Sequence, residues 1–516
     1  MEPETTQPTT ATGAQPVAAP PVVDDRPAEP VRQVNGLHAH VLGDMQVLAQ
    51  SVSGIAPSIA AGALVPLAFA DAGSGAWFTV LIATIGILCV GICVTELAVR
   101  HVSTGALYTL VPKGLGPAGG LVTGVMMIIN TVVSGPFLAL GFGIFLNQFL
   151  GSVGLGSGSP AVTIAVDLAV VVAVTVIAYL DIRISTRVLL AIEAASMTAI
   201  SLLLVIVLAK HGAIFDRAQL ALHGTSAHGM LLGIVFLVLS FGTFEGATAL
   251  GVEARRPRRG VRLAVLGSVI LAGLFFVVNA YVQVLGFSGT GLKIASQSAP
   301  LNSLADHYGV SWLGDLILLG VAFSFFGALN AWLNYIPRMV FAMGSDRVLP
   351  RSLSRAHPRT GSPYIAILSW SAVWLLVLVI IFAGGINQTN AFNDFGAFSG
   401  YFFTLVYLLV ALAAPVYLMR AGTPSLVVTL AALVGGAVMG IEFYFSFIPM
   451  PASPLNFFVY AFAASVAATL VGSAVAARFA PGWFRRIGTT EEPSVAAAGD
   501  VMVATPLVIS APPNGV

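Results

Sequence analysis

Long apolar runs separated by short polar loops fill the chain from about residue 43 to residue 478. A helix needs about 20 mostly apolar residues to cross a hydrocarbon core of about 30 Å, and it satisfies its own backbone hydrogen bonds there. The pattern therefore predicts an all-α integral membrane protein with twelve transmembrane helices. We expect them near residues 43–70, 77–99, 119–149, 160–181, 187–209, 229–252, 262–287, 312–337, 363–384, 391–418, 425–448 and 455–478.

The two ends of the chain lack this pattern. Residues 1–40 are rich in Pro, Thr and Ala, and residues 481–516 contain short polar and small-residue stretches. Segments of this composition bury too little apolar surface to repay the entropy of ordering. We expect two disordered tails around one membrane domain, which spans residues 41–480.

The basic residues are distributed unevenly between the two sides. With twelve spans, both tails and the even-numbered loops share a side, and that side holds all of the 23 lysines and arginines except Lys210, Arg217 and Lys293. Basic residues concentrate in cytoplasmic loops. The sequence therefore predicts that both termini are cytoplasmic.

Composition narrows the class of protein further. Hydrophobic residues make up 57% of the chain and charged residues 9%, against about 25% charged in soluble domains. A net charge of +1 argues against nucleic acid as a partner, because duplex binding needs a dense basic face. The two cysteines, Cys89 and Cys93, lie one helical turn apart within an apolar run, where packing is the simpler interpretation. We expect neither a metal ion nor a cofactor.

Two of the spans contain candidate interruptions. The first span includes "SVSGIAPSIAAG" (51–62) and the sixth includes "FGTFEGATALG" (241–251). Pro57 lacks an amide hydrogen, and the glycines of both stretches tolerate non-helical backbone. Either stretch alone is also compatible with a packing kink, since Gly and Pro are common in membrane helices.

The spacing of the two interruptions favours a specific architecture. Spans one and six are five apart and run in opposite directions, which is the relation between two inverted five-helix repeats. These repeats would cover residues 43–209 and 229–418, with two extra helices over 425–478. Free backbone groups at such interruptions suit a small zwitterion, because half-helix N-termini favour anions.

Four stretches of the chain also resemble a known family. They are "FGTFEGATALGVEARRPRRGVRLAV" (241–265), "ELAVRHVSTGALYTLVPKGLGPAGG" (96–120), "RMVFAMGSDRVLPRSLSRAHPRTGSP" (338–363) and "SGIAPSIAAG" (53–62). Together they resemble the amino acid, polyamine and organocation (APC) transporter superfamily over nearly the whole region from 40 to 480. The resemblance implies the LeuT-like fold of five plus five helices with helices 1 and 6 broken, two extra C-terminal helices, and secondary transport by alternating access.

The resemblance also implies where the substrate binds. In the family, the unwound part of span one offers amides to a substrate carboxylate, and carbonyls of span six meet the ammonium group. The corresponding positions here are Ile55, Ala56, Pro57 and Ser58 in span one, and Phe241, Gly242, Thr243 and Phe244 in span six. Many relatives have Gly-x-Gly where this chain has Pro57. Because proline removes one donor, carboxylate binding would fall to neighbouring amides and to the Ser58 hydroxyl.

Glu245 is the charged residue that most needs an explanation, because a charge at mid-membrane costs about 3 kcal/mol on insertion scales. One hypothesis makes it the acid whose protonation is coupled to transport. The alternative is a structural residue that joins the two broken helices by hydrogen bonds. Sodium coupling is less favoured, since span eight offers only Ser324 as a hydroxyl near its middle.

Other polar residues within the spans are weaker candidates. Glu193 in span five would face an inner pathway or pair with Arg187. Asn130 in span three would line the cavity or serve packing. Asp394 and Tyr401 in span ten are candidates for a vestibule and a gate.

The leading functional hypothesis is a proton-coupled permease for an amino acid or related amine in the plasma membrane. The alternatives are an amine or polyamine exchanger, favoured if Asp394 and Glu245 both face the pathway, and a non-transporting nutrient receptor. A membrane enzyme would need clustered metal ligands or a nucleophile with its base, and the sequence shows neither.

Overall fold

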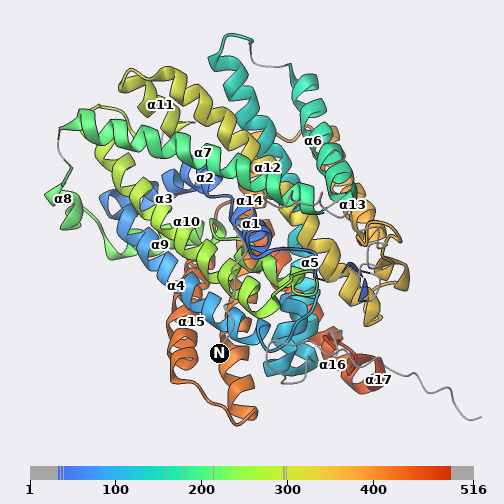
Figure 1. Cartoon of the computed structure of the whole chain (residues 1–516). Helices are drawn as coiled ribbons and strands as arrows, with labels where there is room; N and C mark the ends of the chain where they lie inside the picture. Colours follow the sequence, from blue (N-terminus) through green and yellow to red (C-terminus); the bar gives the residue numbers. More distant parts are fainter. Residues whose placement is uncertain are drawn as a thin grey trace, which may run out of the picture.

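The computed structural model describes residues 33–34, 37–38, 40–156, 159–180, 182–212, 214–294, 297 and 299–489. Within this part of the chain, twelve helices are long and apolar enough to cross a membrane. The predicted fold class, an all-α multi-pass membrane protein, is confirmed. Figure 1 shows the helices gathered into one tilted bundle.

The first five spans are formed by eight helical segments. Span one is divided among four of them, whereas α5 bends once at Gly116, which has φ 74°. The segments are α1 (Asp44–Ile55), α2 (Pro57–Ile59), the π-helical η1 (Ala60–Leu64), α3 (Val65–Ala72), α4 (Ala76–Ala98), α5 (Leu107–Ser152), α6 (Pro160–Leu180) and α7 (Ile182–His211), with a 3₁₀ turn η2 (Gly73–Gly75) after α3.

The second half repeats this arrangement, with its own interrupted span, and then adds two helices. Several of its helices begin at side-chain caps. At α14, for example, the side-chain oxygen Oδ1 of Asn387 accepts from the amides of Thr389 and Asn390. The segments are α8 (Arg217–Leu220), α9 (Ala227–Leu239), η3 (Phe244–Leu250), α10 (Pro257–Phe287), α11 (Pro300–His307), α12 (Ser311–Ser345), η5 (Arg351–Ser354), α13 (Tyr364–Ala383), α14 (Gln388–Arg420), α15 (Leu426–Phe447), α16 (Leu455–Phe479) and α17 (Pro481–Phe484).

Helix α5 begins twelve residues earlier than the sequence pattern predicts, at Leu107 rather than at 119. The stretch before the bend at Gly116 is a short helix of its own. It packs against the bundle, where Tyr108 is buried and its hydroxyl donates to Asp346 Oδ2 at 2.7 Å. Glycine at position 116 permits the positive φ of the bend. The loop between spans two and three is therefore largely helical.

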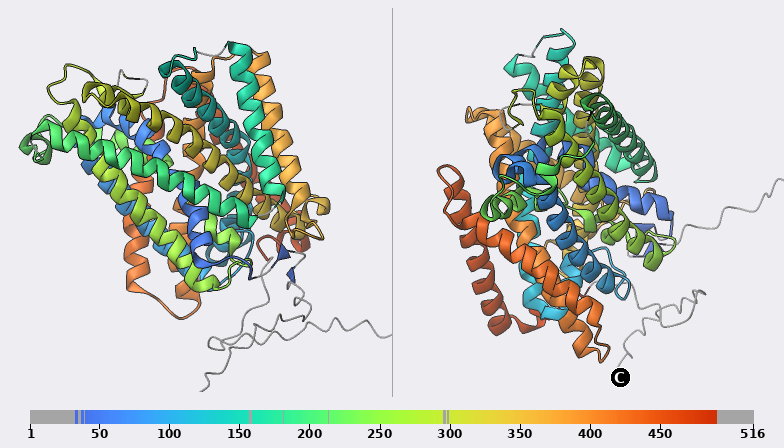
Figure 2. Two further views of the ribbon diagram at one scale, coloured as in Figure 1. Left: turned by 45° about the horizontal axis from the view of Figure 1, so that its top comes forward. Right: turned by 90° about the vertical axis from the view of Figure 1, so that its left-hand side faces the viewer.

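The centre of the bundle is built around α5, which packs extensively on both α14 and α12. Large side chains such as Trp374 and Phe325 are fully buried among them. The last helix, α16, lies at the periphery and is the least buried of the twelve candidate spans, and Figure 2 shows α15 and α16 as an outer pair. The interior is thus formed by the two repeats, with the extra helices outside.

Both described ends of the chain dock on the same face of the bundle. A short hairpin, β1 (Gln33–Val34) and β2 (Leu37–His38), precedes span one, and the Leu42 amide donates to Glu253 O at 2.9 Å. At the other end, the Gly488 amide donates to Asp346 Oδ2 at 2.9 Å. The expectation of disorder throughout 1–40 and 481–516 is therefore corrected near the membrane domain, because Leu37 and Ile487 bury their side chains. Residues 1–32 and 490–516 lie outside the described part.

Candidate functional site

Span one is interrupted at Ala56, between α1 and α2. Ala56 has φ 50° and ψ 69°, in the left-handed region, while its amide still donates to Val52 O at 2.9 Å. A non-glycine residue pays about 1–2 kcal/mol for this conformation. The interruption lies where Pro57 predicts it. The residue that adopts the left-handed conformation, however, is Ala56 and not one of the nearby glycines.

Span six is interrupted over a longer stretch. Helix α9 ends at Leu239, Thr243 adopts a left-handed conformation with φ 61°, and the chain continues as the 3₁₀ helix η3. The Thr243 hydroxyl donates to Gly242 O at 2.7 Å, which satisfies a carbonyl that the ended helix leaves free. Both interruptions that the sequence predicts are therefore present.

The two interruptions touch each other. A Cβ atom on Gly54 would lie 2.6 Å from Thr243 Oγ1 and 3.2 Å from Thr243 O, so only glycine allows this approach. Nearby, Ser51 Oγ donates to Phe244 O at 2.7 Å. The interrupted parts of spans one and six consequently form one structural unit.

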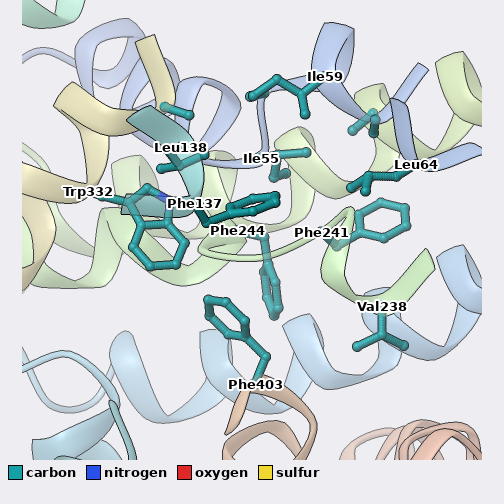
Figure 3. Close-up of a cluster of buried hydrophobic side chains, with 14 of the residues drawn as sticks. Ile55, Ile59, Leu64, Phe137, Leu138, Val238, Phe241, Phe244, Trp332 and Phe403 are labelled. Atoms are coloured by element: carbon teal, nitrogen blue, oxygen red, sulfur yellow. The ribbon is translucent and has the colours of Figure 1, made fainter. Parts of the chain in front are cut away.

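A small cavity of about 30 Å³ lies beside this contact. Such a volume accommodates a water molecule and is far too small for an amino acid. Figure 3 shows Phe137 and Trp332 crowding the Ile55 side of the break. The lining residues are Gly54, Ile55, Ala56, Ile59, Leu64, Phe137, Leu138, Leu239, Ser240, Gly242, Ala328, Trp332 and Ser399.

Only part of the predicted substrate site faces this cavity. Ile55, Ala56 and Gly242 line it. Phe241 instead packs its ring edge-on against Phe276, and Phe244 packs against Tyr407, with centroid distances of 5.1 and 5.0 Å. Pro57, Ser58 and Thr243 adjoin the cavity through the backbone of the two breaks without lining it. Trp332, Phe137 and Ser399 were not predicted, since nothing in their local sequence marks them.

Glu193 reaches the break from span five. Its Oε1 accepts from the Ser58 amide at 2.8 Å, and its Oε2 accepts from Ser324 Oγ at 2.6 Å. The residue is 2% exposed. Pairing with Arg187 was the expected alternative, but the Arg187 side chain lies outside the described part. Glu193 thus joins α2, α7 and α12.

Glu245 lies in the first turn of η3, and two tyrosines donate hydrogen bonds to its carboxyl group. Its Oε2 accepts from Tyr407 Oη at 2.9 Å and its Oε1 from Tyr335 Oη at 3.3 Å. All three residues are fully buried. The carboxyl group therefore links span six to spans eight and ten, and it does not line the cavity.

The remaining candidates are dispersed. Asn130 Oδ1 accepts from Ser399 Oγ at 2.7 Å, which joins spans three and ten at the edge of the cavity. Tyr401 lies against Phe447 and Phe462 of the two extra helices. Asp394 is partly exposed on α14. The structure does not bring Tyr401 or Asp394 to the break.

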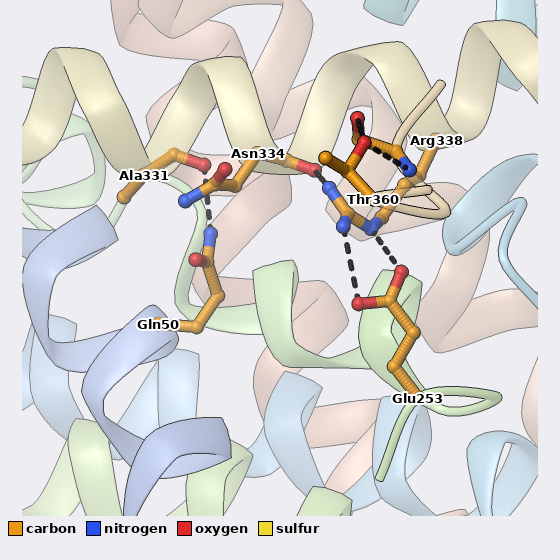
Figure 4. Close-up of polar contacts among 7 residues, drawn as sticks. Gln50, Glu253, Ala331, Asn334, Arg338 and Thr360 are labelled. Atoms are coloured by element: carbon orange, nitrogen blue, oxygen red, sulfur yellow. Dashed lines mark hydrogen bonds and ion pairs between the residues drawn. The ribbon is translucent and has the colours of Figure 1, made fainter. Parts of the chain in front are cut away.

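Residues from α1, from α12 and from the chain after η3 meet on the side on which the described ends of the chain lie. Arg338 forms a buried ion pair with Glu253, at 2.7 and 3.1 Å, and Gln50 Nε2 donates to Ala331 O at 2.7 Å (Figure 4). In the sequence, Glu253 lies beside Arg255 and Arg256 of its own loop, and nothing there indicates a pair with Arg338. A cleft of about 480 Å³ opens next to this network, and its lining includes Ala49 and Leu190.

Metal-binding geometry is not evident in the described ranges. No group of three or more His, Cys, Asp and Glu side chains is arranged there to hold an ion. The polar centre of the fold consists instead of backbone groups, hydroxyls and isolated carboxyl groups.

Known proteins resemble this chain along most of its length. The model of the amino acid permease family matches residues 46–485. An uncharacterized transporter of Mycobacterium tuberculosis is 31% identical over 423 residues, which cover 80% of this chain and 88% of that protein. The serine/threonine exchanger SteT of Bacillus subtilis is 24% identical over 63% of this chain and 73% of its own length. The branched-chain amino acid permease BcaP of the same organism is 22% identical over 57% and 65%.

A solved structure supports the same architecture. A mutant of the manganese transporter of Eremococcus coleocola superposes with a TM-score of 0.53 at 13% identity, covering 86% of this chain and 94% of that one. This likeness concerns the fold alone. Taken with the family match and the long loops quoted above, it shows that the chain is a membrane transporter that belongs to the amino acid permease family of the APC superfamily.

Proposed function

We propose that this transporter is a permease for an amino acid with a neutral, largely apolar side chain, working by alternating access and coupled to protons. The observation that carries the proposal is the contact between the two interrupted spans beside a cavity lined by apolar side chains. Backbone groups at the breaks can bind the two charged ends of a zwitterion. The names of the relatives SteT and BcaP, which refer to amino acids, agree with this class.

The amine or polyamine alternative is less well supported. It depends on Asp394 and Glu245 both facing the pathway, so that two carboxylates could replace the one that the substrate lacks. In the described part of the chain, the residues that line the cavity include no charged side chain. An amino acid brings both charges with it, and its side chain would meet Phe137 and Trp332.

The size of the cavity supports alternating access. Because about 30 Å³ cannot hold an amino acid, the substrate needs a second conformation in which the bundle opens. The cleft beside Ala49 and Leu190 lies on the face that carries both described ends of the chain. We propose that this face is cytoplasmic, that the membrane is the plasma membrane, and that the ion pair between Arg338 and Glu253 belongs to its closed state.

Proton coupling is assigned to Glu245. An ionised carboxylate accepts hydrogen bonds from both Tyr335 and Tyr407, whereas a protonated one must donate through one oxygen. Protonation therefore changes the bonds between span six and spans eight and ten. Binding and release of a proton by Glu245 would then be linked to the conformation of the three spans.

The test is uptake by proteoliposomes. A panel of radiolabelled neutral amino acids, cationic amino acids and polyamines would be offered with and without an inward proton gradient. The native chain would be compared with Glu245→Gln and with Glu442→Gln, which alters another buried carboxyl group, on α15 and bonded to Ser446. We expect gradient-driven accumulation of a neutral amino acid by the native chain and the control, and its loss in Glu245→Gln.

Other outcomes separate the alternatives. Counterflow that ignores the gradient and survives Glu245→Gln would indicate an exchanger in which Glu245 is structural. Accumulation of polyamines alone would contradict the amino acid assignment. Ligand-dependent stabilisation without any uptake would indicate a receptor.

A further inference from the structure

Every backbone amide at the break of span one is already engaged. The Ala56 amide donates to Val52 O, and the amides of Ile59 and Ala60 both donate to Ala56 O, at 2.9 and 3.4 Å. Pro57 has no amide hydrogen. The Ser58 amide remains, and it donates to Glu193 Oε1 at 2.8 Å. A substrate carboxylate therefore finds no free amide at this break.

The bond between Ser58 and Glu193 has the chemistry of carboxylate recognition. An ionised carboxylate that accepts from a backbone amide forms a charge-assisted bond, stronger than a neutral one. The second oxygen of Glu193 accepts from the Ser324 hydroxyl, and both serines are fully buried. The side chain thus supplies from within the protein the group that an amino acid would bring.

The cavity offers no substitute for this amide. Its lining, in the described part of the chain, contains no lysine or arginine that could bind a carboxylate. To pair its carboxylate with a backbone amide at the break, an entering amino acid must therefore compete with Glu193. An unpaired charge in a buried site is far more costly than an exchange of partners.

We propose that Glu193 is an internal occupant of the substrate carboxylate position, and that the carboxylate of an entering amino acid displaces it from the Ser58 amide. This inference rests on the proposed amino acid substrate. It goes beyond that proposal because it assigns a competing residue to the site and predicts that the chain lowers its own affinity for substrate.

A place for the displaced side chain exists on the same helix. Ser196 lies one turn after Glu193, is 3% exposed, and its hydroxyl has no hydrogen-bond partner. It faces α12, since a Cβ on Gly320 would lie 2.6 Å from Ser196 Oγ. The Glu193 carboxyl group can accept from the Ser196 hydroxyl once it leaves the amide.

Displacement also has a structural consequence. Glu193 connects the outer half of span one to spans five and eight, so its release removes one tie that holds this conformation. A ligand shifts a conformational equilibrium only through contacts that differ between the states. Exchange at the Ser58 amide provides such a contact, and it is specific for ligands that carry a carboxylate.

The test measures binding to the purified full-length protein in detergent. Probes would be alanine, leucine, isoleucine and phenylalanine, each paired with the amine that its decarboxylation yields. The variants would be Glu193→Ala, which vacates the amide; Glu193→Gln, which keeps the shape but not the charge; and Glu442→Gln as the control. Thermal unfolding and gel filtration would establish that each variant is folded.

We expect Glu193→Ala to bind the amino acids about ten- to a hundredfold more tightly, the effect of one charge-assisted hydrogen bond released from competition. Glu193→Gln should show a smaller gain, the amines should change less than about twofold, and Glu442→Gln should match the native chain. If Glu193→Ala fails to fold, Ser324→Ala weakens the hold on Glu193 and should give a gain in the same direction.

Distinct results would overturn the inference. Equal amino acid affinities in the native chain and the folded Glu193 or Ser324 variants would exclude displacement while leaving the proposed function intact. An equal gain for amines and amino acids would show that the carboxylate is not the competing group. Absence of amino acid binding to every variant, including the one with a vacated amide, would contradict both proposals.

Discussion

The two interrupted spans solve the same problem in different ways. Span one breaks over a single residue, Ala56, and the buried Ser58 amide just after the break donates to a carboxylate from another helix, Glu193. Span six breaks over several residues, carries its own carboxyl group at Glu245, and receives hydroxyl donors from Tyr335 and Tyr407. The carboxylate at span one thus accepts from a backbone amide, whereas the carboxyl group at span six accepts from side-chain hydroxyls.

This difference separates two roles. The carboxylate at span one occupies a backbone donor that a substrate could use, so it bears on binding. The carboxyl group at span six contacts only side chains outside the cavity, so it bears on the connection among three spans. Substitutions at each break, and at the contacts that hold the adjoining segments of spans one and six, test this difference.

The largest expected effect concerns the contacts that hold spans one and six on the side where the described ends of the chain lie. Glu253→Ala would leave the buried guanidinium of Arg338 without its partner, at a cost of about 3–5 kcal/mol in the free energy of unfolding. The α1 part of span one is held by the neutral bond between Gln50 and Ala331 O, so Gln50→Leu should cost about 1 kcal/mol. Unfolding by SDS in mixed micelles measures both.

The exposed pair of Glu96 and Arg100 provides the control for that experiment. Arg100 Nη2 lies 2.6 Å from Glu96 Oε1, but solvent screens this pair. Glu96→Ala should therefore lower the free energy of unfolding by less than about 1 kcal/mol. A similar loss for Glu96→Ala and Glu253→Ala would contradict the role given to burial.

The contact between the breaks predicts the next effect. Gly54→Ala inserts a methyl group 2.6 Å from Thr243 Oγ1, and overpacking of this kind costs about 1–3 kcal/mol. Because this contact lies beside the proposed substrate site, uptake should fall more than stability. Gly400→Ala, where nothing lies within 4 Å of the added atom, should leave uptake and the melting temperature nearly unchanged.

The two tyrosines that donate to Glu245 of span six, Tyr335 on span eight and Tyr407 on span ten, should differ in importance. Tyr407→Phe removes the shorter bond to Glu245, 2.9 Å against 3.3 Å for Tyr335. We expect Tyr407→Phe to cost about 1–2 kcal/mol and Tyr335→Phe less. The free energy of unfolding of each variant, and of each combined with Glu245→Gln, would reveal the coupling. Additive losses would show that the hydroxyls do not act through Glu245.

The smallest effect is a gain. Ala56→Gly relieves the left-handed conformation at φ 50° and should stabilise the protein by about 1 kcal/mol. Ala60→Gly, at a right-handed position with φ −61°, should instead cost about 1 kcal/mol. Equal losses at both positions would mean that the break at Ala56 stores no strain.

Local sequence predicted much of the site's frame. Pro57 marks the break of span one because it lacks an amide hydrogen, and the glycines Gly242 and Gly246 mark that of span six because they tolerate non-helical backbone. The lining of the cavity was predicted less well. Ile55, Ala56 and Gly242 line it, while Phe241 and Phe244 turn their rings toward Phe276 and Tyr407, because the direction of a ring depends on neighbours from other helices.

The sequence by itself determined that the chain spans a membrane twelve times and where two of the spans break. Hydrocarbon imposes a span length and demands that each backbone group be satisfied, and both requirements act on local sequence. Only the tertiary structure decided which distant groups meet. Glu193 pairs with a residue 135 positions away and Arg338 with one 85 positions away, because these partners are set by how the helices pack and not by the residues beside them.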